Sequence, residues 1–244
     1  MTSQFLGYVR RTVIGGTTGI AGYSTYKVNT NPLHIFWDLD HTILCSISPL
    51  PESDEIKDQR AFGFAPTLRY FDQIDDDFPF DPQTPTPNTR TYFRPGARLT
   101  IWLCSFFATN HVYTAAQRTY TENILKQIDP DRKLFHIVIH RDDYPQIVKE
   151  GKDLKIGTSQ MERAILFDDR TSNFKPQHYQ NGVGVLPFTP TRVEQCLGGS
   201  WMAYFEELGE MGRLLSVAFL GSVHWSGDVR KVVMNANDGR HGDD

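Results

Sequence analysis

The sequence predicts an α/β fold with a central, mainly parallel sheet, and three observations carry this prediction. Short apolar runs of strand length alternate with segments of helical periodicity over most of the chain, as in βα units. Three of the apolar runs end abruptly in polar residues, which is typical of buried parallel strands. Prolines are concentrated within residues 46–95, so we expect an irregular insertion after the first strand.

The first half of the chain contains two predicted strands and one predicted helix. Leu33–Trp37 is an apolar run that leads directly into an acidic loop, and we expect it to be a buried strand. Within the insertion, a short helix or hairpin is expected around Thr67–Ile74. A helix follows over Ala97–Ala108, because its apolar residues form one broad face. The strand His111–Tyr113 comes next and ends at Thr114.

The second half continues the same alternation. A helix is predicted over Gln117–Ile128, with Pro130 as its stop. Strands are predicted at Leu134–Ile139, Ala164–Phe167 and Gly182–Phe188. A last, packed helix is predicted from six large apolar residues at helical spacing: Trp201, Tyr204, Phe205, Leu208, Leu214 and Leu215.

The composition is that of an ordinary globular protein. The chain has 244 residues, 39% of them hydrophobic and 22% charged, which is enough for one domain with a sizeable core. The net charge of −4 argues against direct binding to nucleic acid, because such domains usually carry a basic face. The three cysteines lack the spacing of zinc ligands or of a disulfide framework, so we expect reduced thiols at Cys45, Cys104 and Cys196.

The amino terminus differs in composition from the rest of the chain. No Asp or Glu precedes Asp38, whereas Arg10, Arg11 and Lys27 are present. Acid-poor, arginine-containing starts are typical of mitochondrial transit segments. This composition favours a mitochondrial location over the nucleus or cytoplasm, and it allows association with the inner membrane or its translocase. The alternative is a flexible leader that carries no targeting signal. The chain divides into three predicted segments: a leader (1–31), a folded domain (32–233) and a disordered tail (234–244).

Asp38 and Asp40 follow the first predicted strand, and Thr42 comes two residues later. Side chains two residues apart on an extended chain face the same side, and two carboxylates so close need a cation or a shared proton. A carboxylate nucleophile suits phosphoryl transfer, because an aspartyl-phosphate divides one hard hydrolysis into two easier steps. The second carboxyl group can act as general acid and then as general base. A helix cap is the plain structural alternative, since Asp and Thr are common there.

A second acidic pair, Asp168 and Asp169, follows another predicted strand. Magnesium prefers oxygen ligands and usually keeps several waters, so Asp38, Asp169 and the backbone carbonyl of Asp40 would suffice, with Asp168 beside them. A solvated turn is the alternative for this pair taken alone. Two acidic pairs after two buried strands favour a metal site, because the carboxyl ends of parallel strands meet at one crevice.

Two further residues are candidates for stabilising a transferred phosphoryl group, which needs hydrogen-bond donors and cations. Thr114 stands at the end of its own predicted strand. Lys152 lies in a polar loop before the strand that leads to Asp168. Lys149 and Lys155 are rival cations, and the plain alternative for any lysine is a surface position.

The motifs, taken in order, resemble a known family. The segments DLDHT, YTAAQ, KDL and LFDDR resemble the four motifs of the haloacid dehalogenase superfamily. The branch they are most similar to contains the phosphatases of the carboxyl-terminal domain of RNA polymerase II and their small, NLI-interacting-factor-like relatives. The segments TYFRPGARL, at Thr91–Leu99, and TAAQRTYTENILKQIDP extend the resemblance, which covers Pro32–Phe188. It implies a Rossmann-like, three-layer fold.

The resemblance also implies a role for each motif residue. Asp38 would be the nucleophile and Asp40 the acid/base. Thr114 and Lys152 would stabilise the phosphoryl group, and Asp169 would be a ligand of Mg²⁺, with Asp168 beside it. The implied function is a magnesium-dependent phosphatase that acts on phosphoserine or phosphothreonine in an extended protein segment.

Two other functions remain open from the sequence. A presequence receptor of the mitochondrial inner-membrane translocase is similar to this family and often has degraded catalytic motifs; the acid-free leader favours it, whereas the complete motif set favours an enzyme. A phosphatase of small metabolites is less favoured, because such enzymes usually carry a capping domain, for which the insertion at 46–95 is the sole candidate.

Overall fold

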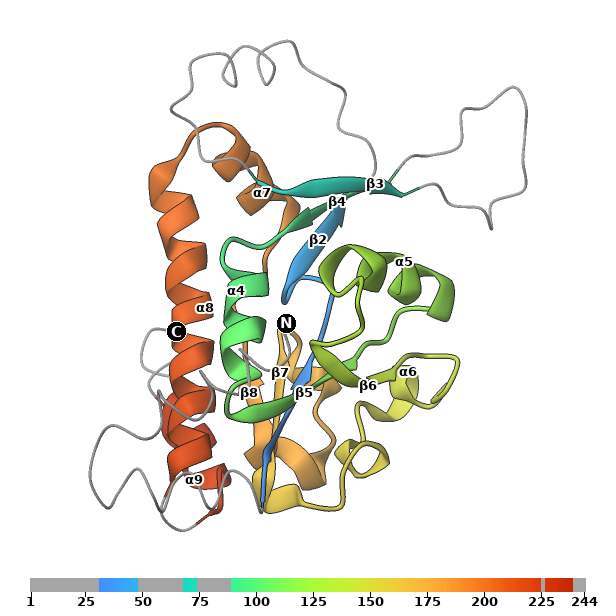
Figure 1. Ribbon diagram of the computed structural model, residues 1–244, viewed down its shortest axis with the longest axis vertical. Coiled ribbons are helices and arrows are strands. Elements are labelled where there is room, and N and C mark those ends of the chain that lie inside the picture. Colours follow the sequence, from blue (N-terminus) through green and yellow to red (C-terminus); the bar gives the residue numbers. More distant parts are fainter. Residues whose placement is uncertain (1–30, 48–67, 74–88, 225–226, 239–244) are drawn as a thin grey trace, which may run out of the picture.

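The fold consists of two sheets and the helices that pack on them (Figure 1). The computed structural model describes residues 31–47, 68–73, 89–224 and 227–238. The strands are β1 (Leu33–Trp37), β2 (Leu44–Ile47), β3 (Tyr70–Gln73), β4 (Thr89–Phe93), β5 (Ala108–Tyr113), β6 (Phe135–Ile139), β7 (Ala164–Asp168) and β8 (Gly182–Gly184). The larger sheet is parallel, in the order β6-β5-β1-β7-β8. The smaller sheet is antiparallel, in the order β2-β4-β3.

Two of the described α-helices begin at a residue whose side chain accepts a hydrogen bond from a free backbone N–H group of the first turn. At the start of the helix Trp201–Val223, the Ser200 hydroxyl accepts a hydrogen bond from the backbone N–H of Ala203 (3.2 Å). Thr189 caps the helix Pro190–Leu197 in the same way, and Pro190 occupies its first turn. In the described part of the chain, no helix is both long and apolar enough to span a membrane. The α-helices are α4 (Ala97–Cys104), α5 (Arg118–Ile128), α6 (Ile147–Glu150), α7 (Pro190–Leu197), α8 (Trp201–Val223) and α9 (Arg230–Asp238). Short 3-10 helices occupy Leu154–Ile156, Met161–Arg163, Thr171–Asn173 and Pro176–Asn181.

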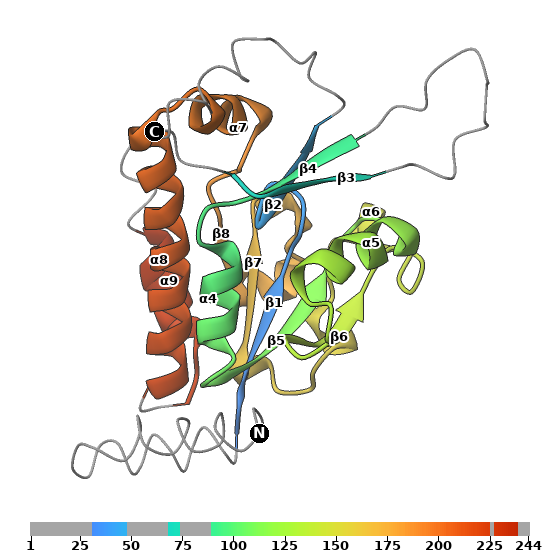
Figure 2. The same ribbon diagram turned by 45° about the horizontal axis from the view of Figure 1, so that its top comes forward.

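Helices cover both faces of the larger sheet, so the predicted three-layer α/β fold is confirmed. Figures 1 and 2 show α4 and α8 on one side of the sheet and α6 on the other. Ile35 of β1 packs with Ile101 of α4 and Leu214 of α8, whereas the next residue, Phe36, packs with Ile147 of α6. Successive side chains of a strand point to opposite faces, so β1 contributes to both hydrophobic clusters.

The insertion predicted over residues 46–95 contributes strands to the smaller sheet. Of the two structures expected around Thr67–Ile74, the hairpin is the one observed, because β3 pairs with β4. Residues 48–67 and 74–88 of the insertion lie outside the described residues. Residues 1–30 of the predicted leader also lie outside them.

One boundary between a helix and a strand differs from the prediction. Helix α4 ends at Cys104 rather than at Ala108, where β5 already begins. The buried side chain of Asn110 accepts a hydrogen bond from Trp37 Nε1 (3.0 Å) and donates one to the Ile101 carbonyl (3.0 Å). These bonds attach the first half of β5 to β1 and to the last turn of α4, and an extension of α4 to Ala108 would break them.

The carboxyl-terminal elements also differ in length from the prediction. Strand β8 ends at Gly184 rather than at Phe188, because the Phe188 backbone N–H donates to the His41 carbonyl (2.7 Å) of a different loop. Helix α9 continues to Asp238, so the first residues of the predicted tail are helical. The side chain of Asn237 donates a hydrogen bond (2.9 Å) to a backbone carbonyl of β8.

Histidines from neighbouring strands are stacked on one face of the larger sheet. The His111 ring, which is 1% exposed, lies 4.7 Å from the Phe36 ring and 5.3 Å from the His34 ring, measured between centroids. His111 Nε2 is 3.0 Å from His34 Nδ1, so the two rings share one hydrogen bond. Burial, with a smaller contribution from His34 and His136, lowers the pKa of His111 to about 3.

This stack predicts that the protein loses stability in mild acid. Below the unfolded pKa of about 6.5, the unfolded chain binds a proton at residue 111 that the folded protein excludes. The free energy of unfolding should therefore fall by about 1.4 kcal/mol per pH unit from this group between pH 6.5 and 4. When the free energy of unfolding is measured by urea titration at several pH values, His111→Gln should remove this contribution of about 1.4 kcal/mol per pH unit. Equal slopes in wild type and His111→Gln would contradict the lowered pKa of His111.

Candidate active site

Three neighbouring strands end at the same edge of the larger sheet. Strands β5, β1 and β7 lie side by side, and Thr114, Asp38 and Asp168 stand at their respective carboxyl ends. The chain first adds β5 and β6 on one side of β1 and then crosses to add β7 and β8 on the other. Ligands of open α/β sheets bind at such a switch point. The structure therefore brings the two predicted acidic pairs to one place.

Three carboxylates meet at this edge. One oxygen each of Asp38, Asp168 and Asp169 lies within 4.8 Å of the others. Asp38 is 6% exposed and Asp168 is fully buried. Burial raises the pKa of Asp38 well above its usual range; Lys152 opposes this effect, and the nearby Asp168 adds to it. Burial, followed by the charge of Asp168, also raises the pKa of Asp169. The cluster is therefore short of positive charge.

Lys152 is the cation inside this cluster. Its Nζ lies 2.5 Å from Asp38 Oδ1 and 2.6 Å from Asp168 Oδ2, and the residue is fully buried. Burial lowers the pKa of Lys152, but the charges of Asp168 and Asp38 outweigh it, so the net shift is upward and the ammonium group stays charged. The predicted rivals, Lys149 and Lys155, are both exposed.

The loop before Lys152 depends on a glycine. Gly151 has a φ of 78°, and a Cβ atom there would lie 2.7 Å from the Asn173 carbonyl oxygen. That close approach allows the Lys152 backbone N–H to donate to the same carbonyl oxygen at 2.7 Å. A larger residue at position 151 would displace the loop, because L-residues rarely adopt this φ and the backbone oxygen cannot move aside easily.

Asp168 and Asp169 differ in how many of their acceptor positions are taken. Both oxygens of Asp168 accept hydrogen bonds from Asn173 (3.0 and 3.1 Å); Oδ1 also accepts one from the Arg170 backbone N–H (2.8 Å). Among the described residues, Asp169 accepts one long side-chain bond, from the Thr42 hydroxyl at 3.4 Å, and its backbone N–H donates to the same hydroxyl oxygen at 3.1 Å. Asp169 therefore has oxygen lone pairs free for a ligand, whereas Asp168 is an anchor for Lys152.

The donor set fits a magnesium ion. In the described part of the chain, three carboxylates cluster around the one buried ammonium group of Lys152, so the charge is unbalanced without a cation or protons. Asp38 and Asp169 offer the hard oxygen ligands that magnesium prefers, and two or three protein oxygens are enough for it. The side chain of Asp40 is not one of the three clustered carboxylates, so its predicted contribution is through the backbone carbonyl. Bound Mg²⁺ would supply the positive charge that lets these carboxylates ionise together and would draw electron density from a phosphoryl group.

The carboxylate of Asp40 is held by a chain of hydroxyl groups from three elements. The Tyr120 hydroxyl, from α5, donates a short hydrogen bond to Asp40 Oδ1. Ser46 of β2 lies 2.7 Å from the Tyr120 hydroxyl and 2.7 Å from the hydroxyl of Thr91 in β4. Because the Tyr120 proton points to Asp40, Tyr120 accepts from Ser46 and Ser46 from Thr91. Burial raises the pKa of Asp40, and the bond from Tyr120 opposes that rise.

Sequence reasoning did not find this contact. In the sequence, Tyr120 falls on the apolar face of the helix predicted over Gln117–Ile128, where a tyrosine is an ordinary core residue. The available signal was its position six residues after Thr114, in a segment that resembles the family sequence. The partner residue Asp40 is 80 positions away in the chain, so no local pattern connects the two.

Residues distant in the chain hold the loop that follows Asp38 in place. His41 has a φ of 60°, and its Nδ1 lies 3.1 Å from the Phe188 carbonyl oxygen. The buried Arg94 donates to the Thr42 carbonyl at 3.0 Å and forms an ion pair with Glu207 of α8 at 2.6 Å. The arginine of the RPG turn thus ties the acidic loop to the longest helix.

Thr114 lies where it was predicted, at the end of β5. Its backbone N–H donates to the Ile139 carbonyl at 2.9 Å, and its hydroxyl accepts from the Ala116 backbone N–H at 3.1 Å. The residue is 1% exposed. These bonds form a tight turn after β5 beside Asp38, but they do not assign Thr114 a chemical role.

Comparison with known proteins identifies the family. The model of the family described as "NLI interacting factor-like phosphatase" matches residues 33–214. The structure of Fcp1, an essential phosphatase of the RNA polymerase II CTD, superposes with a TM-score of 0.54 at 16% identity, covering 91% of this chain and 70% of Fcp1.

A second similar structure is fission yeast Fcp1 bound to beryllium fluoride, with a TM-score of 0.52 at 16% identity, covering 88% of this chain and 73% of that one. At this identity the structural likeness shows the fold, and the family model adds the family. The chain therefore belongs to the NLI interacting factor-like phosphatases, a family of the haloacid dehalogenase superfamily.

Proposed function

We propose that the protein is a magnesium-dependent phosphoprotein phosphatase that forms an aspartyl-phosphate on Asp38. The observation that carries this proposal is the environment of the Asp38 carboxylate. Lys152 holds Oδ1, while Oδ2 makes no hydrogen bond with any described residue. The carboxylate is thus oriented by one oxygen and free to attack through the other. Asp169, with its free lone pairs, lies beside it.

The proposed reaction has two steps. In the first, Asp38 Oδ2 forms a bond to phosphorus, the bond from phosphorus to the serine or threonine oxygen breaks, and Asp40 gives its proton to that oxygen. In the second, Asp40 takes a proton from water, the water oxygen attacks phosphorus, and the bond to Asp38 breaks with release of inorganic phosphate. The raised pKa of Asp40 suits a group that must carry a proton in one step and accept one in the next.

Lys152 and Thr114 would support the charge on the transferred group. Lys152 is fixed between Asp38 and Asp168, so its ammonium group needs little rearrangement to face a phosphoryl oxygen on Asp38. Asp168 would keep that lysine in place. Thr114 would contribute its hydroxyl and the backbone N–H groups of its turn.

The proposed substrate is a phosphoserine or phosphothreonine within an extended protein segment. Fcp1 is a phosphatase of the RNA polymerase II CTD, and the shared fold makes a protein substrate the first one to test here. The smaller sheet adjoins the site through the Thr91–Ser46–Tyr120 hydroxyl chain to Asp40, so β2 and β4 are the neighbouring elements for a bound peptide.

The direct test is hydrolysis of an aryl phosphate and of phosphoserine and phosphothreonine peptides. We expect release of phosphate that depends on Mg²⁺ and stops when EDTA is added. Activity on the peptides but not on small phosphorylated metabolites would support the substrate class. Inactivity over a range of metals and pH would instead support the receptor function, in which the protein binds presequences without chemistry.

Tyr120 should affect turnover through Asp40. Tyr120→Phe removes the hydroxyl that orients Asp40, so we expect kcat to fall by on the order of tenfold, a part of the 10²–10⁴ that general acid–base catalysis supplies. KM should change little, because the lost bond is not one to the substrate. Tyr179→Phe, at an exposed tyrosine, is the matched control and should behave as wild type. An unchanged kcat for Tyr120→Phe would show that the hydrogen bond has no role in turnover.

A further inference from the structure

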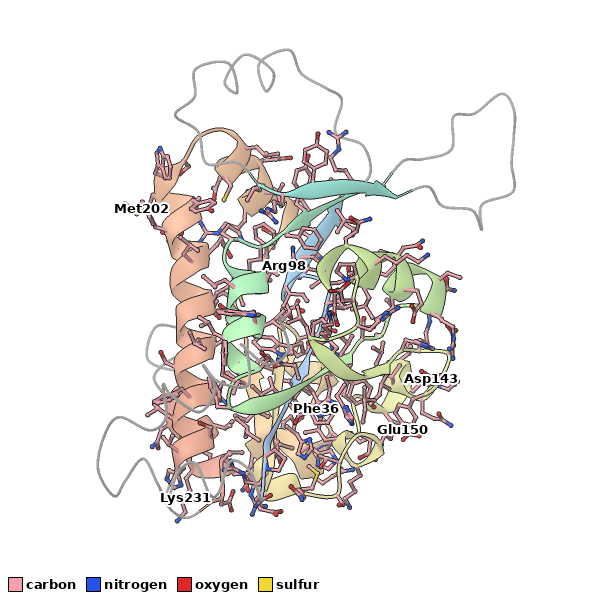
Figure 3. All side chains as sticks on the ribbon, in the orientation of Figure 1. Phe36, Arg98, Asp143, Glu150, Met202 and Lys231 are labelled. Carbon is pink, nitrogen blue, oxygen red and sulfur yellow. The ribbon has the colours of Figure 1, made fainter. Side chains whose placement is uncertain are left out.

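Helix α8 is apolar on two faces, and one of them is exposed to solvent. Its inner face packs Leu214, Val217 and Ala218 into the larger core cluster. The six large apolar residues on the other side are each more than a third exposed: Trp201 (49%), Met202 (71%), Phe205 (59%), Phe219 (52%), Leu220 (54%) and Val223 (37%). The sequence predicts a packed helix here, yet Trp201 and Phe205 of the predicted apolar set face solvent. Met202, labelled in Figure 3, lies on the outer side of α8, and α8 forms one edge of the molecule in Figure 1.

The exposed residues form one continuous stripe. At 3.6 residues per turn, the six residues fall within a sector of about 100°, and three small residues fill the middle of the same sector. These are Gly209, Gly212 and Ser216. A Cβ atom at Gly209 or at Gly212 would meet nothing within 4 Å, so the centre of the stripe is open. We call these nine residues the outer stripe. A surface helix normally has a single such stripe, facing the core, so a second one indicates another contact.

The borders of the outer stripe carry no unpaired charge among the described residues. Glu206 lies 2.6 Å from Arg192, and Arg213 lies 2.8 Å from Glu210. Helices that lie on a membrane surface usually have lysines or arginines along their border that meet acidic lipid. The outer stripe lacks such cations, which favours a protein partner over a lipid surface.

We propose that the outer stripe binds the outer stripe of a second copy of this chain, with the two α8 helices antiparallel. The order of residues is symmetric about Gly212: large apolar groups at both ends and small groups between. A two-fold axis at Gly212 would place Trp201 opposite Val223 and Phe205 opposite Phe219 of the other copy. An isologous interface needs this self-complementarity, and the small central residues let the helices approach closely.

The exposed apolar area is sufficient for a specific dimer. The six large side chains together leave on the order of 600 Å² exposed per copy, given the 150–250 Å² that an aromatic side chain can bury. Complete burial of these side chains in two copies would give about 1,200 Å², which reaches the lower end of the range for specific protein–protein interfaces. The interface does not depend on the proposed catalysis, because none of its residues lies at the acidic cluster.

The first test is the mass of the full chain in solution. At about 100 μM, where a dimer of micromolar affinity is nearly complete, analytical ultracentrifugation should show a dimer. Phe205→Glu places a charge in the stripe and should raise the dissociation constant at least 30-fold, as expected for an interface hot spot. Val148→Glu, at an exposed apolar residue of α6, is the matched control and should remain dimeric. A wild-type monomer at this concentration, or equal dissociation constants for all three proteins, would overturn the proposal.

The second test reports the orientation of the helices. On oxidation, the G212C protein should form a disulfide with its own copy, because residue 212 lies on the two-fold axis. The F205C protein should cross-link with the F219C protein when the two are mixed and not by itself. Self-cross-linking of F205C and of F219C would show a parallel pair and overturn the proposed geometry. Flotation of monomeric wild type with phosphatidylserine vesicles, lost in Phe205→Glu, would assign the stripe to a membrane instead.

Discussion

Asp38→Asn should lower kcat for aryl-phosphate hydrolysis by a factor on the order of 10⁴ or more, which is the scale of loss when a covalent nucleophile is removed. Asparagine keeps the shape of the side chain and an oxygen near Lys152, but its amide does not form the aspartyl-phosphate. Steady-state phosphate release with saturating Mg²⁺ measures the effect. Asp131→Asn, at an exposed surface acid, is the matched control and should retain wild-type turnover.

The same variant should not be less stable than wild type. Burial raises the pKa of Asp38 in the folded protein, so its ionised form destabilises the fold once the pH exceeds the unfolded value of about 3.9. Removing that charge should keep Tm equal or raise it at pH 7 in EDTA, while Lys152 retains Asp168 as its partner. Added Mg²⁺ should raise the Tm of wild type more than that of the variant. Wild-type turnover in Asp38→Asn would remove Asp38 from the mechanism.

Lys152→Met should affect both folding and catalysis. The substitution leaves Asp38 and Asp168 buried without their cation, and breaking a buried ion pair in this way costs about 3–5 kcal/mol. For a chain of this size we expect Tm to fall by roughly 6–20 °C, at about 2–4 °C per kcal/mol. Thermal unfolding in EDTA measures this loss directly, since no metal then replaces the missing charge.

Two comparisons separate this effect from general damage. Lys155→Met, at an exposed lysine three residues away, should leave Tm unchanged. In the double variant of Lys152→Met with Asp168→Asn, one of the stranded charges is gone, so part of the lost stability should return while activity stays low. If Lys152→Met alone kept the wild-type Tm, the lysine could not be the buried counter-ion that its two short contacts indicate.

The order of strands and helices could be predicted from the sequence because it depends on local patterns. The run at Leu33–Trp37 is a strand with the predicted bounds, and its abrupt change into Asp38 places that carboxylate at a strand end. The second acidic pair is expected near Asp38 because the carboxyl ends of parallel strands lie at the same edge of a sheet. The clustering of Asp38, Asp168 and Asp169 agrees with that reasoning.

The ends of the elements were harder to predict, because distant residues decide them. The aromatic residues after Cys104 continue the apolar pattern of α4, yet the helix stops there. Asn110 is bonded to Trp37, a residue of another strand 73 positions away, and this contact starts β5 early. Likewise, Phe188 leaves β8 to pair with the backbone of His41. No window of local sequence contains both partners of either contact.

Local sequence patterns are enough to predict the fold class, the strand ends that carry Asp38 and Asp168, and the candidate ligands for magnesium, since each follows from residues that are neighbours in the chain. Three other features become visible only in the folded chain: Asp168 anchors Lys152 while Asp169 keeps lone pairs free of described donors, Tyr120 orients Asp40, and one apolar face of α8 is left exposed. Each of these depends on which surfaces meet after the sheet and helices have packed. Packing brings together groups that are far apart in the chain, and the folded surroundings then set their protonation, hydrogen bonds and exposure.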